Sequence, residues 1–324
     1  MKRSIKAVVL AAGKSKRMKS GYSKVLHKIL GKEIINLLLD SIIGSGIRQE
    51  DIILVVGPEN SQIKKAINRN IQYAIQKDPL GTAHAVLCAR EQLVNFQGDL
   101  LVSIGDNPYI TSAEISRLRN QHQQSGSQCT LISAIFPHRP PPYGRIIRDQ
   151  NHEVLGVIEE KDASPDQLNI KEVNASIYMF ENEIVFPLIS DIKNDNAKNE
   201  YYLTDIIALC KSEKLKVNTL IAENYQDTIG INNRWEIQEA QKRLNERNQK
   251  KLALEHGITI YQPDTVTIEY QVDIGGNTII YPSTYIAAGT RIGKNCHIGP
   301  FAYLKEVSIP DNSTVAFEKR IKGE

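Results

Sequence analysis

The loop that follows the first apolar run of the sequence could bind phosphate groups. It occupies residues 10–18, with the sequence Leu-Ala-Ala-Gly-Lys-Ser-Lys-Arg-Met, and we call it the first loop. Backbone N–H groups can approach phosphate oxygens in a tight turn that contains glycine. Lys14, Lys16 and Arg17 can offset the charge of a triphosphate. A Gly-Lys turn after a strand is equally often an ordinary turn, and neither the Walker nor the dinucleotide-binding glycine pattern is present.

Strands and helices alternate up to about Gly230, and these elements must position the first loop. The expected strands are Lys6–Ala11, Ile52–Val56, Leu100–Ile104, Gln128–Ile135 and Val154–Glu159. The expected helices are Glu33–Gly44, Ser61–Ile67, Gly81–Leu93 and Ser112–Ser125. This alternation predicts an α/β fold with a mostly parallel sheet covered on both faces. Ligands of such sheets bind beyond the carboxyl ends of the strands, which is where the first loop lies.

The remainder of the chain has two other patterns. The charged segment Trp235–Glu255 ends before Gly257 and predicts a solvated helix with a glycine cap. After it, seven aliphatic residues recur at every sixth position: Ile268, Ile274, Ile280, Ile286, Ile292, Ile298 and Leu304. This period predicts a parallel β-helix of slightly more than two coils, in which each flat face turns one aliphatic residue inward. We expect the register to fail at Pro310, before a charged tail.

Composition excludes several classes of protein. The formal charge of +3 comes from 40 basic and 37 acidic residues among 324, which is too weak to indicate a nucleic-acid partner. The apolar stretch Ala7–Ala12 is too short for a secretory signal, and no apolar run approaches the roughly 20 residues of a membrane span. Four scattered cysteines predict reduced thiols and a cytoplasmic protein: Cys88, Cys129, Cys210 and Cys296.

A set of motifs in fixed order covers nearly the whole chain. The first loop continues with Ser23-Lys24-Val25-Leu26-His27. Later motifs are Gln76 with Leu80–Ala85, Gly105–Pro108, Tyr143–Ile146, Glu159–Ala163, Glu172–Asn174, Glu200–Asp205 and Gly230–Asn233. This set resembles the sugar-nucleotide pyrophosphorylases, and more narrowly the uridylyltransferase half of the bifunctional N-acetylglucosamine-1-phosphate uridylyltransferase/acetyltransferase family. The resemblance implies a Rossmann-like nucleotidyltransferase domain over 1–233, a linker helix over 234–257 and a truncated left-handed β-helix over 258–324.

The resemblance also implies the reaction and its metal. UTP and a sugar-1-phosphate would react to give a UDP-sugar and pyrophosphate, by in-line attack on the α-phosphorus. Such a transfer needs positioning and charge neutralisation rather than a covalent nucleophile or a histidine base, so we place His27 and His84 in the core or on a helix. The implied ligands of Mg²⁺, which prefers oxygen and keeps several waters, are Asp106 and Asn232.

The remaining site residues are implied in the same way. Arg17 and Lys24 would hold phosphate oxygens and act in catalysis. Gln76, Gly81 and Thr82 would select uracil, and Thr82 would also serve as a helix N-cap. Gly144, Glu159 and Asn174 would contact the sugar. The full implied substrate-binding set is Leu10, Ala11, Ala12, Gly13, Lys24, Gln76, Gly81, Thr82, Gly144, Glu159, Asn174 and Asn232.

Four departures from the family pattern affect this site. They are Ser15 and Lys16 in place of glycine and threonine, Ser23 in place of proline, Asn174-Ala175-Ser176 in place of Asn-Thr-Gly, and Asn107 and Tyr109 in place of aliphatic residues. If residue 15 has a positive φ, serine there costs about 1 kcal/mol or more. Ser23 would loosen the approach of Lys24, and Ala175 with Ser176 leaves the identity of the sugar open.

Three functions fit these observations. The leading hypothesis is a UTP:N-acetylglucosamine-1-phosphate uridylyltransferase. The alternatives are a uridylyltransferase for another sugar phosphate and a non-catalytic sugar-nucleotide-binding protein. Since the chain ends before the region that carries the acetyl-CoA site in the bifunctional relatives, and His297 does not match their catalytic histidine, we expect no acetyltransferase activity. A short β-helix buries little core by itself, so we expect a homo-oligomer, specifically a trimer.

Overall fold

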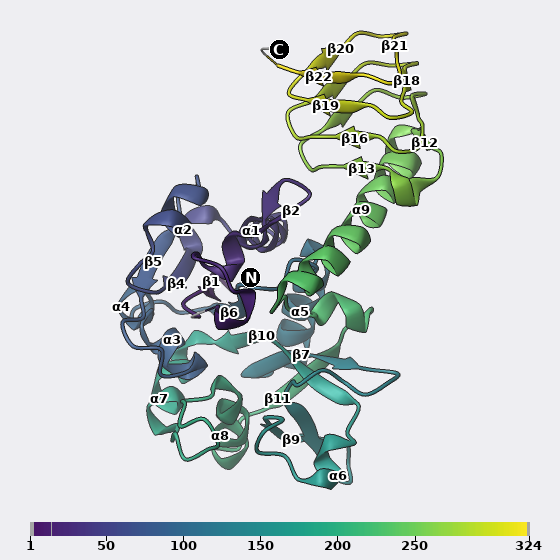
Figure 1. Cartoon of the computed structure of the whole chain (residues 1–324). Helices are drawn as coiled ribbons and strands as arrows, with labels where there is room; N and C mark the ends of the chain where they lie inside the picture. Colours follow the sequence, from purple (N-terminus) through teal and green to yellow (C-terminus); the bar gives the residue numbers. More distant parts are fainter. Residues whose placement is uncertain (1–2, 14, 323–324) are drawn as a thin grey trace. The chain divides into compact units, whose positions relative to one another are not determined.

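The computed structural model describes residues 3–13 and 15–322, apart from the side chain of Lys16. It contains two compact units (Figure 1). The first consists of the chain up to Leu26 together with Ile35–Gly230, and the second of His27–Ile34 together with the chain from Ile231 onward. Within the described ranges, no helix has the length and apolar character needed to cross a bilayer. The division of the chain at 233 and 257 stays our proposal.

A mixed, mostly parallel sheet forms the centre of the first unit. Its strands run in the order β11-β7-β10-β6-β1-β4-β5, and β8 and β9 extend it from β10. The strands are β1 (Ile5–Leu10), β4 (Ile52–Val56), β5 (Gln72–Ile75), β6 (Asp99–Ile104), β7 (Cys129–Ile135), β8 (Arg145–Arg148), β9 (Val154–Ile158), β10 (Glu172–Glu181) and β11 (Val217–Ile221). Strands β5, β4, β1 and β6 are parallel neighbours, whereas β10 is antiparallel to both β6 and β7. The predicted α/β fold with a mostly parallel sheet is confirmed.

Helices cover both faces of this sheet because its strands are apolar on both sides. Ala7 and Val9 of β1 pack into one core, and Val8 packs into the other. The first core also takes side chains from α1 (Ile34–Gly44), α2 (Ser61–Ala66) and α5 (Ser112–Ser125). The second takes side chains from α3 (Thr82–Leu87), α4 (Arg90–Leu93), α7 (Asn182–Asp191) and α8 (Ile206–Ser212). A short helix, α6 (Pro165–Leu168), follows β9.

The first unit differs from the prediction in one divided helix and in several elements that were not predicted. The expected helix Gly81–Leu93 is two helices, because the chain turns at Ala89 through an i to i−3 hydrogen bond from its N–H to Val86 O. Strands β5, β8 and β11 and helices α6, α7 and α8 were not predicted, and neither was the central strand β10. It carries polar residues and its register with β7 shifts between Asn174 and Tyr178, so it lacks the continuous apolar run of its neighbours.

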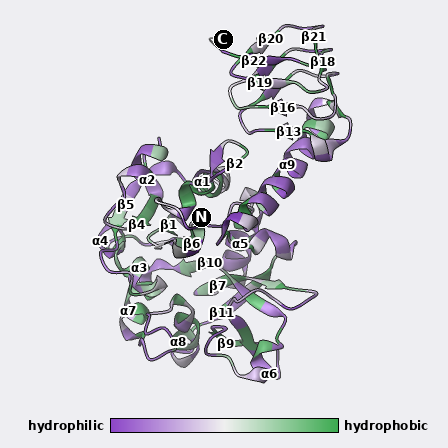
Figure 2. Ribbon diagram, viewed as in Figure 1, coloured by the Kyte–Doolittle hydropathy of each residue, from purple (hydrophilic) through white to green (hydrophobic). Residues whose placement is uncertain are grey.

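The second unit begins with a long polar helix, α9 (Arg234–His256). The side chain of Asn233 accepts a hydrogen bond from the N–H of Glu236 at its start, and Gly257 ends it with φ of 67°. Figure 2 shows that most of α9 is hydrophilic. The hairpin of β2 (Lys28–Ile29) and β3 (Lys32–Glu33) belongs to the same unit, where β2 contacts α9. The predicted helix and its glycine cap are therefore present.

A parallel β-helix completes the second unit. Its three sheets are β12-β15-β18-β21, β13-β16-β19-β22 and β14-β17-β20. These strands are β12 (Thr259–Ile260), β13 (Thr267–Ile268), β14 (Asp273–Ile274), β15 (Ile279–Ile280), β16 (Tyr285–Ile286), β17 (Arg291–Ile292), β18 (His297–Ile298), β19 (Tyr303–Lys305), β20 (Ser308–Ile309), β21 (Thr314–Val315) and β22 (Lys319–Ile321). All seven aliphatic residues of the six-residue repeat are buried in one core, which confirms the predicted β-helix.

The six-residue register fails at Pro310 as predicted, but the β-helix continues beyond this residue. The spacing shortens once, from Leu304 to Ile309, and the pattern then continues to Val315. Ile309 pairs with Ile292 and Val315 pairs with Ile298, so both remain in register with the coil before them. The β-helix therefore has more coils than predicted. Part of the segment that we expected to be a charged tail forms strand β22.

Candidate active site

The first loop leaves the sheet at the carboxyl end of β1, between β4 and β6. The N–H of Ala11 donates to Val55 O, and the N–H of Gly105 donates to Leu10 O, both at 2.8 Å. A Cβ on Gly105 would stand 3.0 Å from Leu10 O, so a small residue at 105 lets the two segments meet. The sheet thus brings the first loop, with Ala12 and Gly13, beside the segment that carries Asp106.

The basic residues of the first loop are only partly described. Lys14 lies outside the described residues, and so does the side chain of Lys16. Arg17 is exposed on a short 3₁₀ turn, η1 (Lys16–Met18), which is anchored by the fully buried Met18. The catalytic role of Arg17 stays a prediction.

Ser15 has the positive φ that the sequence analysis considered. Its φ is 50°, in the left-handed region that favours glycine. Its hydroxyl accepts a hydrogen bond from the backbone N–H of Lys24 at 2.8 Å, and its carbonyl accepts one from the N–H of Met18 at 3.0 Å. Serine is strained at this position, but its hydroxyl makes a hydrogen bond with the Lys24 N–H that glycine could not make.

Lys24 and Asp106 form an ion pair between the Nζ of the lysine and Oδ2 of the carboxylate. Lys24 begins the 3₁₀ turn η2 (Lys24–Leu26), and Asp106 is only 8% exposed. The other oxygen of Asp106, Oδ1, is buried and has no hydrogen-bond partner among the described residues. A Cβ on Gly230 would stand 2.8 Å from this oxygen, so the chain passes close beside it.

The unpaired oxygen of Asp106 fits a divalent cation. A buried carboxylate oxygen without a donor is costly unless a cation or a ligand satisfies it. Throughout residues 3–13 and 15–322, no group of three or more His, Cys, Asp or Glu side chains could hold a metal ion. A cation at Asp106 would accordingly need phosphate oxygens and water as further ligands, which suits Mg²⁺.

Asn232, the other predicted metal ligand, lies in the second unit. It follows Gly230 by two residues in the chain, and its backbone N–H donates to Glu236 Oε2 at 2.6 Å, just before α9 begins. Its role at the metal stays a prediction.

The residues predicted to select uracil lie together at the start of α3. The side-chain amide of Gln76 donates to Gly81 O at 3.0 Å and lies 3.1 Å from His84 Nδ1. Gly81 has φ of 123°, and a Cβ there would stand 2.4 Å from Tyr201 O. Position 81 therefore requires glycine, because the backbone of Tyr201 leaves no room for a side chain. The predicted N-cap at Thr82 is wrong: Gly81 occupies that position, and the Thr82 hydroxyl accepts the Leu203 N–H at 2.9 Å.

The residues predicted to contact the sugar also lie together. The N–H of Asn174 donates to Gly144 O at 2.9 Å, and the Asn174 amide donates to the hydroxyl of Tyr178 at 2.7 Å. A Cβ on Gly144 would stand 3.4 Å from Glu159 Oε1 and 2.6 Å from Val157 Cγ1. Glycine at 144 therefore keeps open the space beside the Glu159 carboxylate.

Two backbone segments join these groups into one site within the first unit. The segment from Tyr201 to Thr204 contacts Gly81 and Thr82, and the Thr204 hydroxyl donates to Glu159 Oε1 at 3.1 Å. Gly230 packs beside Asp106, and its N–H donates to the hydroxyl of Tyr143, the neighbour of Gly144, at 2.9 Å. The residues predicted to bind uracil, the sugar and phosphate are thus connected by contacts.

Several carboxylates lie near Glu159, in the part of the site that is predicted to bind the sugar. Burial raises the pKa of Glu159, and the hydrogen bond from Thr204 opposes that rise. Burial, followed by the charges of Glu159 and Asp162, raises the pKa of Asp205 to about 6. Tyr202 is buried, its pKa is raised to about 12 mainly by burial, and its hydroxyl has no hydrogen-bond partner among the described residues. Ionised carboxylates accept hydrogen bonds, so this group of side chains is suited to binding the hydroxyl groups of a sugar.

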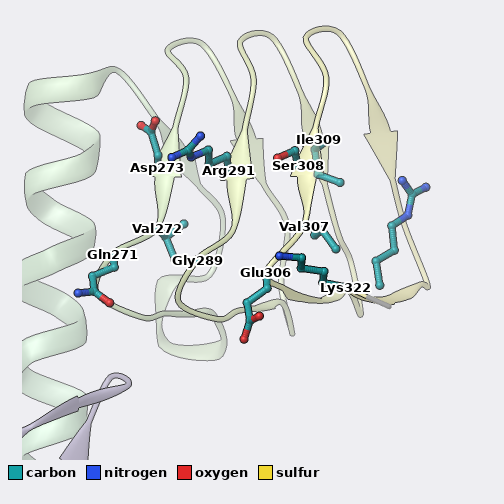
Figure 3. A pocket seen from close by; sticks show the side chains of 11 residues that line it. Gln271, Val272, Asp273, Gly289, Arg291, Glu306, Val307, Ser308, Ile309 and Lys322 are labelled. Atoms are coloured by element: carbon teal, nitrogen blue, oxygen red, sulfur yellow. The ribbon is translucent and has the colours of Figure 1, made fainter. Parts of the chain in front are cut away.

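A separate groove of about 790 Å³ lies on the β-helix (Figure 3). Asp273, Arg291 and Ser308 extend from β14, β17 and β20 along it, with Glu306 and Lys322 at one side. Its exposed charges are of both signs, and it contains none of the predicted site residues. Apart from Asn232, the predicted site residues of the described chain lie in the first unit.

The structure adds residues whose roles the sequence analysis did not foresee. Tyr143, Tyr178 and Thr204 all make hydrogen bonds to predicted site residues or to their backbone neighbours. Tyr143 and Thr204 lie inside quoted motifs, so motif position was a signal for them. Asn107 was noted only as a departure from the family. It is fully buried, donates to Asp227 O at 3.0 Å and accepts the N–H of Tyr109 at 2.9 Å.

Comparison with protein families supports two kinds of domain. A family of nucleotidyl transferases matches residues 6–253, and the bacterial transferase hexapeptide family, defined by six repeats, matches residues 272–306. These matches follow the α/β sheet with α9 and the β-helix, respectively.

Comparison with individual proteins gives relatives along almost the whole chain. The bifunctional protein GlmU of Clostridium kluyveri is 39% identical over 310 residues, which are 95% of this chain and 67% of that protein. The bifunctional protein GlmU of Clostridium beijerinckii is 40% identical over 292 residues, or 90% and 63%. That of Caldanaerobacter subterraneus subsp. tengcongensis is 36% identical over 311 residues, or 96% and 67%. The chain thus spans about two thirds of the length of these relatives.

Proposed function

Because the chain belongs to the nucleotidyl transferase family, and within it to the family of the bifunctional GlmU proteins, we propose that it transfers the uridylyl group of UTP to N-acetylglucosamine-1-phosphate. The products are UDP-N-acetylglucosamine and pyrophosphate. The observation that carries this proposal is the connection of the Lys24–Asp106 pair to Gly144, Glu159 and Asn174 through Gly230 and Tyr143.

The proposed reaction is an in-line displacement at the α-phosphorus of UTP. A phosphate oxygen of the sugar phosphate forms the new bond, the bond from the α-phosphorus to the bridging oxygen breaks, and pyrophosphate leaves with that electron pair. The first loop and Lys24 hold the phosphates, so positioning and charge neutralisation supply the catalysis. Gln76, Gly81 and Thr82 hold uracil. Glu159 and Asn174 hold the sugar against Gly144.

Asp106 and Asn232 would hold the divalent cation, for which we propose Mg²⁺. When bound, the cation neutralises charge on the phosphates. We propose that Lys24, which pairs with Asp106 in this structure, would bind a phosphate oxygen of UTP through its ammonium group.

Pyrophosphate release across a panel of sugar-1-phosphates tests this proposal. Wild-type protein with UTP and Mg²⁺ should turn over N-acetylglucosamine-1-phosphate, and Asp106→Ala should lower kcat/KM on the order of 10³-fold. Asp191→Ala is the matched control, because Asp191 is an exposed carboxylate at the end of α7. Tight binding of a UDP-sugar by folded wild-type protein without any turnover would replace the enzyme with a sugar-nucleotide-binding protein.

A uridylyltransferase for another sugar phosphate is the second candidate. The observation in its favour is the bulge after Asn174, where Ser176 has φ of 57° and its N–H donates to Asn174 Oδ1 at 3.1 Å. Ala175 and Ser176 therefore shape the backbone beside the sugar. Preference for another sugar in the same panel would favour this candidate.

Two further expectations belong to the proposal. We propose that this chain does not transfer acetyl groups, and an assay with acetyl-CoA and glucosamine-1-phosphate tests this directly. We also propose that it forms a homotrimer through its hexapeptide repeats. Light scattering at micromolar concentration should give about three times the chain mass of 36.4 kDa, and a strictly monomeric particle would contradict the trimer.

A further inference from the structure

The hydroxyl of Ser15 connects the first loop to the turn that carries Lys24. It accepts the Lys24 N–H at 2.8 Å and donates to Gly13 O at 3.3 Å, within its own loop. Lys24 is the first residue of η2, where a backbone N–H has no partner from the turn itself. The serine side chain thus satisfies a donor that the local structure leaves open.

This contact fixes the backbone from which the Lys24 side chain reaches Asp106. Lys24 Nζ pairs with Asp106 Oδ2, and both residues are largely shielded from solvent. Position 23 is serine, which leaves its φ free, whereas proline would fix it. Because serine at position 23 does not restrain the backbone before Lys24, the hydrogen bond from the Lys24 N–H to Ser15 restrains it instead.

The backbone conformation of Ser15 is one that a serine adopts only when surrounding contacts hold it. Its φ of 50° is one that glycine adopts without strain. Serine at such a position is disfavoured unless surrounding contacts hold it there. The hydroxyl makes two hydrogen bonds, and one of them is to the residue that holds phosphate in the proposed function.

We propose that Ser15 is a positioning residue that holds Lys24 in place for phosphate binding through its backbone N–H. Ser15 itself touches neither the substrate nor the reacting atoms in this account. The inference rests on the proposed function for its catalytic consequence, whereas the contact between Ser15 and Lys24 stands on the structure and can be measured separately.

Hydrogen exchange of the Lys24 amide measures the contact without any activity assay. Ser15→Ala and Ser15→Gly both remove the acceptor, so the Lys24 amide should exchange about tenfold faster in each, the factor for a hydrogen bond worth about 1.4 kcal/mol. Ser20→Ala is the matched control, because the Ser20 hydroxyl donates to Tyr22 O in the same region. Unchanged exchange in both Ser15 variants would overturn the proposal.

Kinetics then test the consequence for Lys24. Both Ser15 variants should lower kcat about tenfold with little change in KM for the sugar phosphate, and Ser20→Ala should match wild type. A loss confined to Ser15→Ala would overturn the proposal, since Ser15→Gly also lacks the hydroxyl but accepts the positive φ. In a Lys24→Ala background, Ser15→Ala should change kcat less than twofold, because no side chain remains to be positioned.

The contact between Ser15 and Lys24 and the proposed uridylyl transfer can each prove wrong without the other. If wild-type protein does not release pyrophosphate while the Lys24 amide still exchanges faster in both Ser15 variants, the proposed function fails and the link between Ser15 and Lys24 stands. If wild type is active and the double variant loses the full additional factor of ten, Ser15 acts independently of Lys24 and the proposed positioning role is wrong.

Discussion

Replacing Thr204 by valine tests how this site supports Glu159, the carboxylate that we propose to bind the sugar. Thr204 is buried, and its hydroxyl donates to Glu159 Oε1 at 3.1 Å. Valine has nearly the same shape and lacks the donor, so the variant removes the hydrogen bond with little change in packing. The change should weaken binding of the sugar phosphate.

The magnitude follows from the charge of the acceptor. A hydrogen bond to a charged group contributes about 1.5–3 kcal/mol, which corresponds to roughly 10- to 150-fold in kcat/KM. Burial already raises the pKa of Glu159, and the bond from Thr204 lowers it, so Thr204→Val should raise that pKa further. The carboxylate is ionised only above its folded pKa. The loss of stability should therefore be small near pH 4.5 and reach about 1–2 kcal/mol at pH 8.

The assay combines kcat/KM for the sugar phosphate between pH 5 and 9 with urea unfolding at pH 4.5 and pH 8. Thr204→Ser is the matched control, because it keeps the hydroxyl, and it should keep most of the wild-type kcat/KM. A valine variant with unchanged KM and an unchanged pH profile would refute the assignment of Glu159 to the sugar. A stability loss that is equal at both pH values would refute the electrostatic argument.

Three further predictions concern single residues. Asp205→Asn should raise the free energy of unfolding by about 1–2 kcal/mol at pH 8 and leave it unchanged at pH 4. The folded pKa of Asp205 is raised to about 6, so its ionised carboxylate destabilises the fold as the pH rises through 6. Urea unfolding at both pH values measures this difference. Ser176→Gly should stabilise the protein by about 1 kcal/mol, since φ at this residue is 57°, and a lowered midpoint of urea unfolding would contradict that. Asn107→Ala should destabilise it by about 2–3 kcal/mol, since Asp227 O and the N–H of Tyr109 lose their partner; a thermal midpoint equal to wild type would show that water replaces the side chain.

Regular patterns made much of the fold predictable from sequence. Strand β4 is a continuous apolar run because both of its faces are buried, and its predicted bounds, Ile52–Val56, agree with the structure. The β-helix was predictable because one inward residue per face imposes a six-residue period. Strand β10 was not, since its bulge at Asn174 interrupts the pattern. Placement of the hairpin 27–34 in the second unit depends on long-range contacts that no local pattern encodes.

The sequence motifs propose the candidate site as a set of residues, but they do not give its geometry. Motif order identified Lys24, Asp106 and Glu159, and the structure brings Lys24 and Asp106 into contact. The hydrogen bond from the Lys24 N–H to the Ser15 hydroxyl could not be predicted from the sequence, because it depends on how the chain turns between the two residues. The requirement for glycine at Gly81 likewise comes from the backbone of Tyr201, more than a hundred residues away in the chain.

The most direct test of the proposed function is the identity and ratio of the products. Wild-type protein would be incubated with UTP, N-acetylglucosamine-1-phosphate and Mg²⁺, and mass spectrometry would quantify UDP-N-acetylglucosamine beside the pyrophosphate released. Uridylyl transfer at the Lys24–Asp106 site predicts the two products in equal amounts, and neither of them above background with Asp106→Ala. Pyrophosphate without UDP-sugar, or equal products from the Asp106→Ala variant, would contradict it.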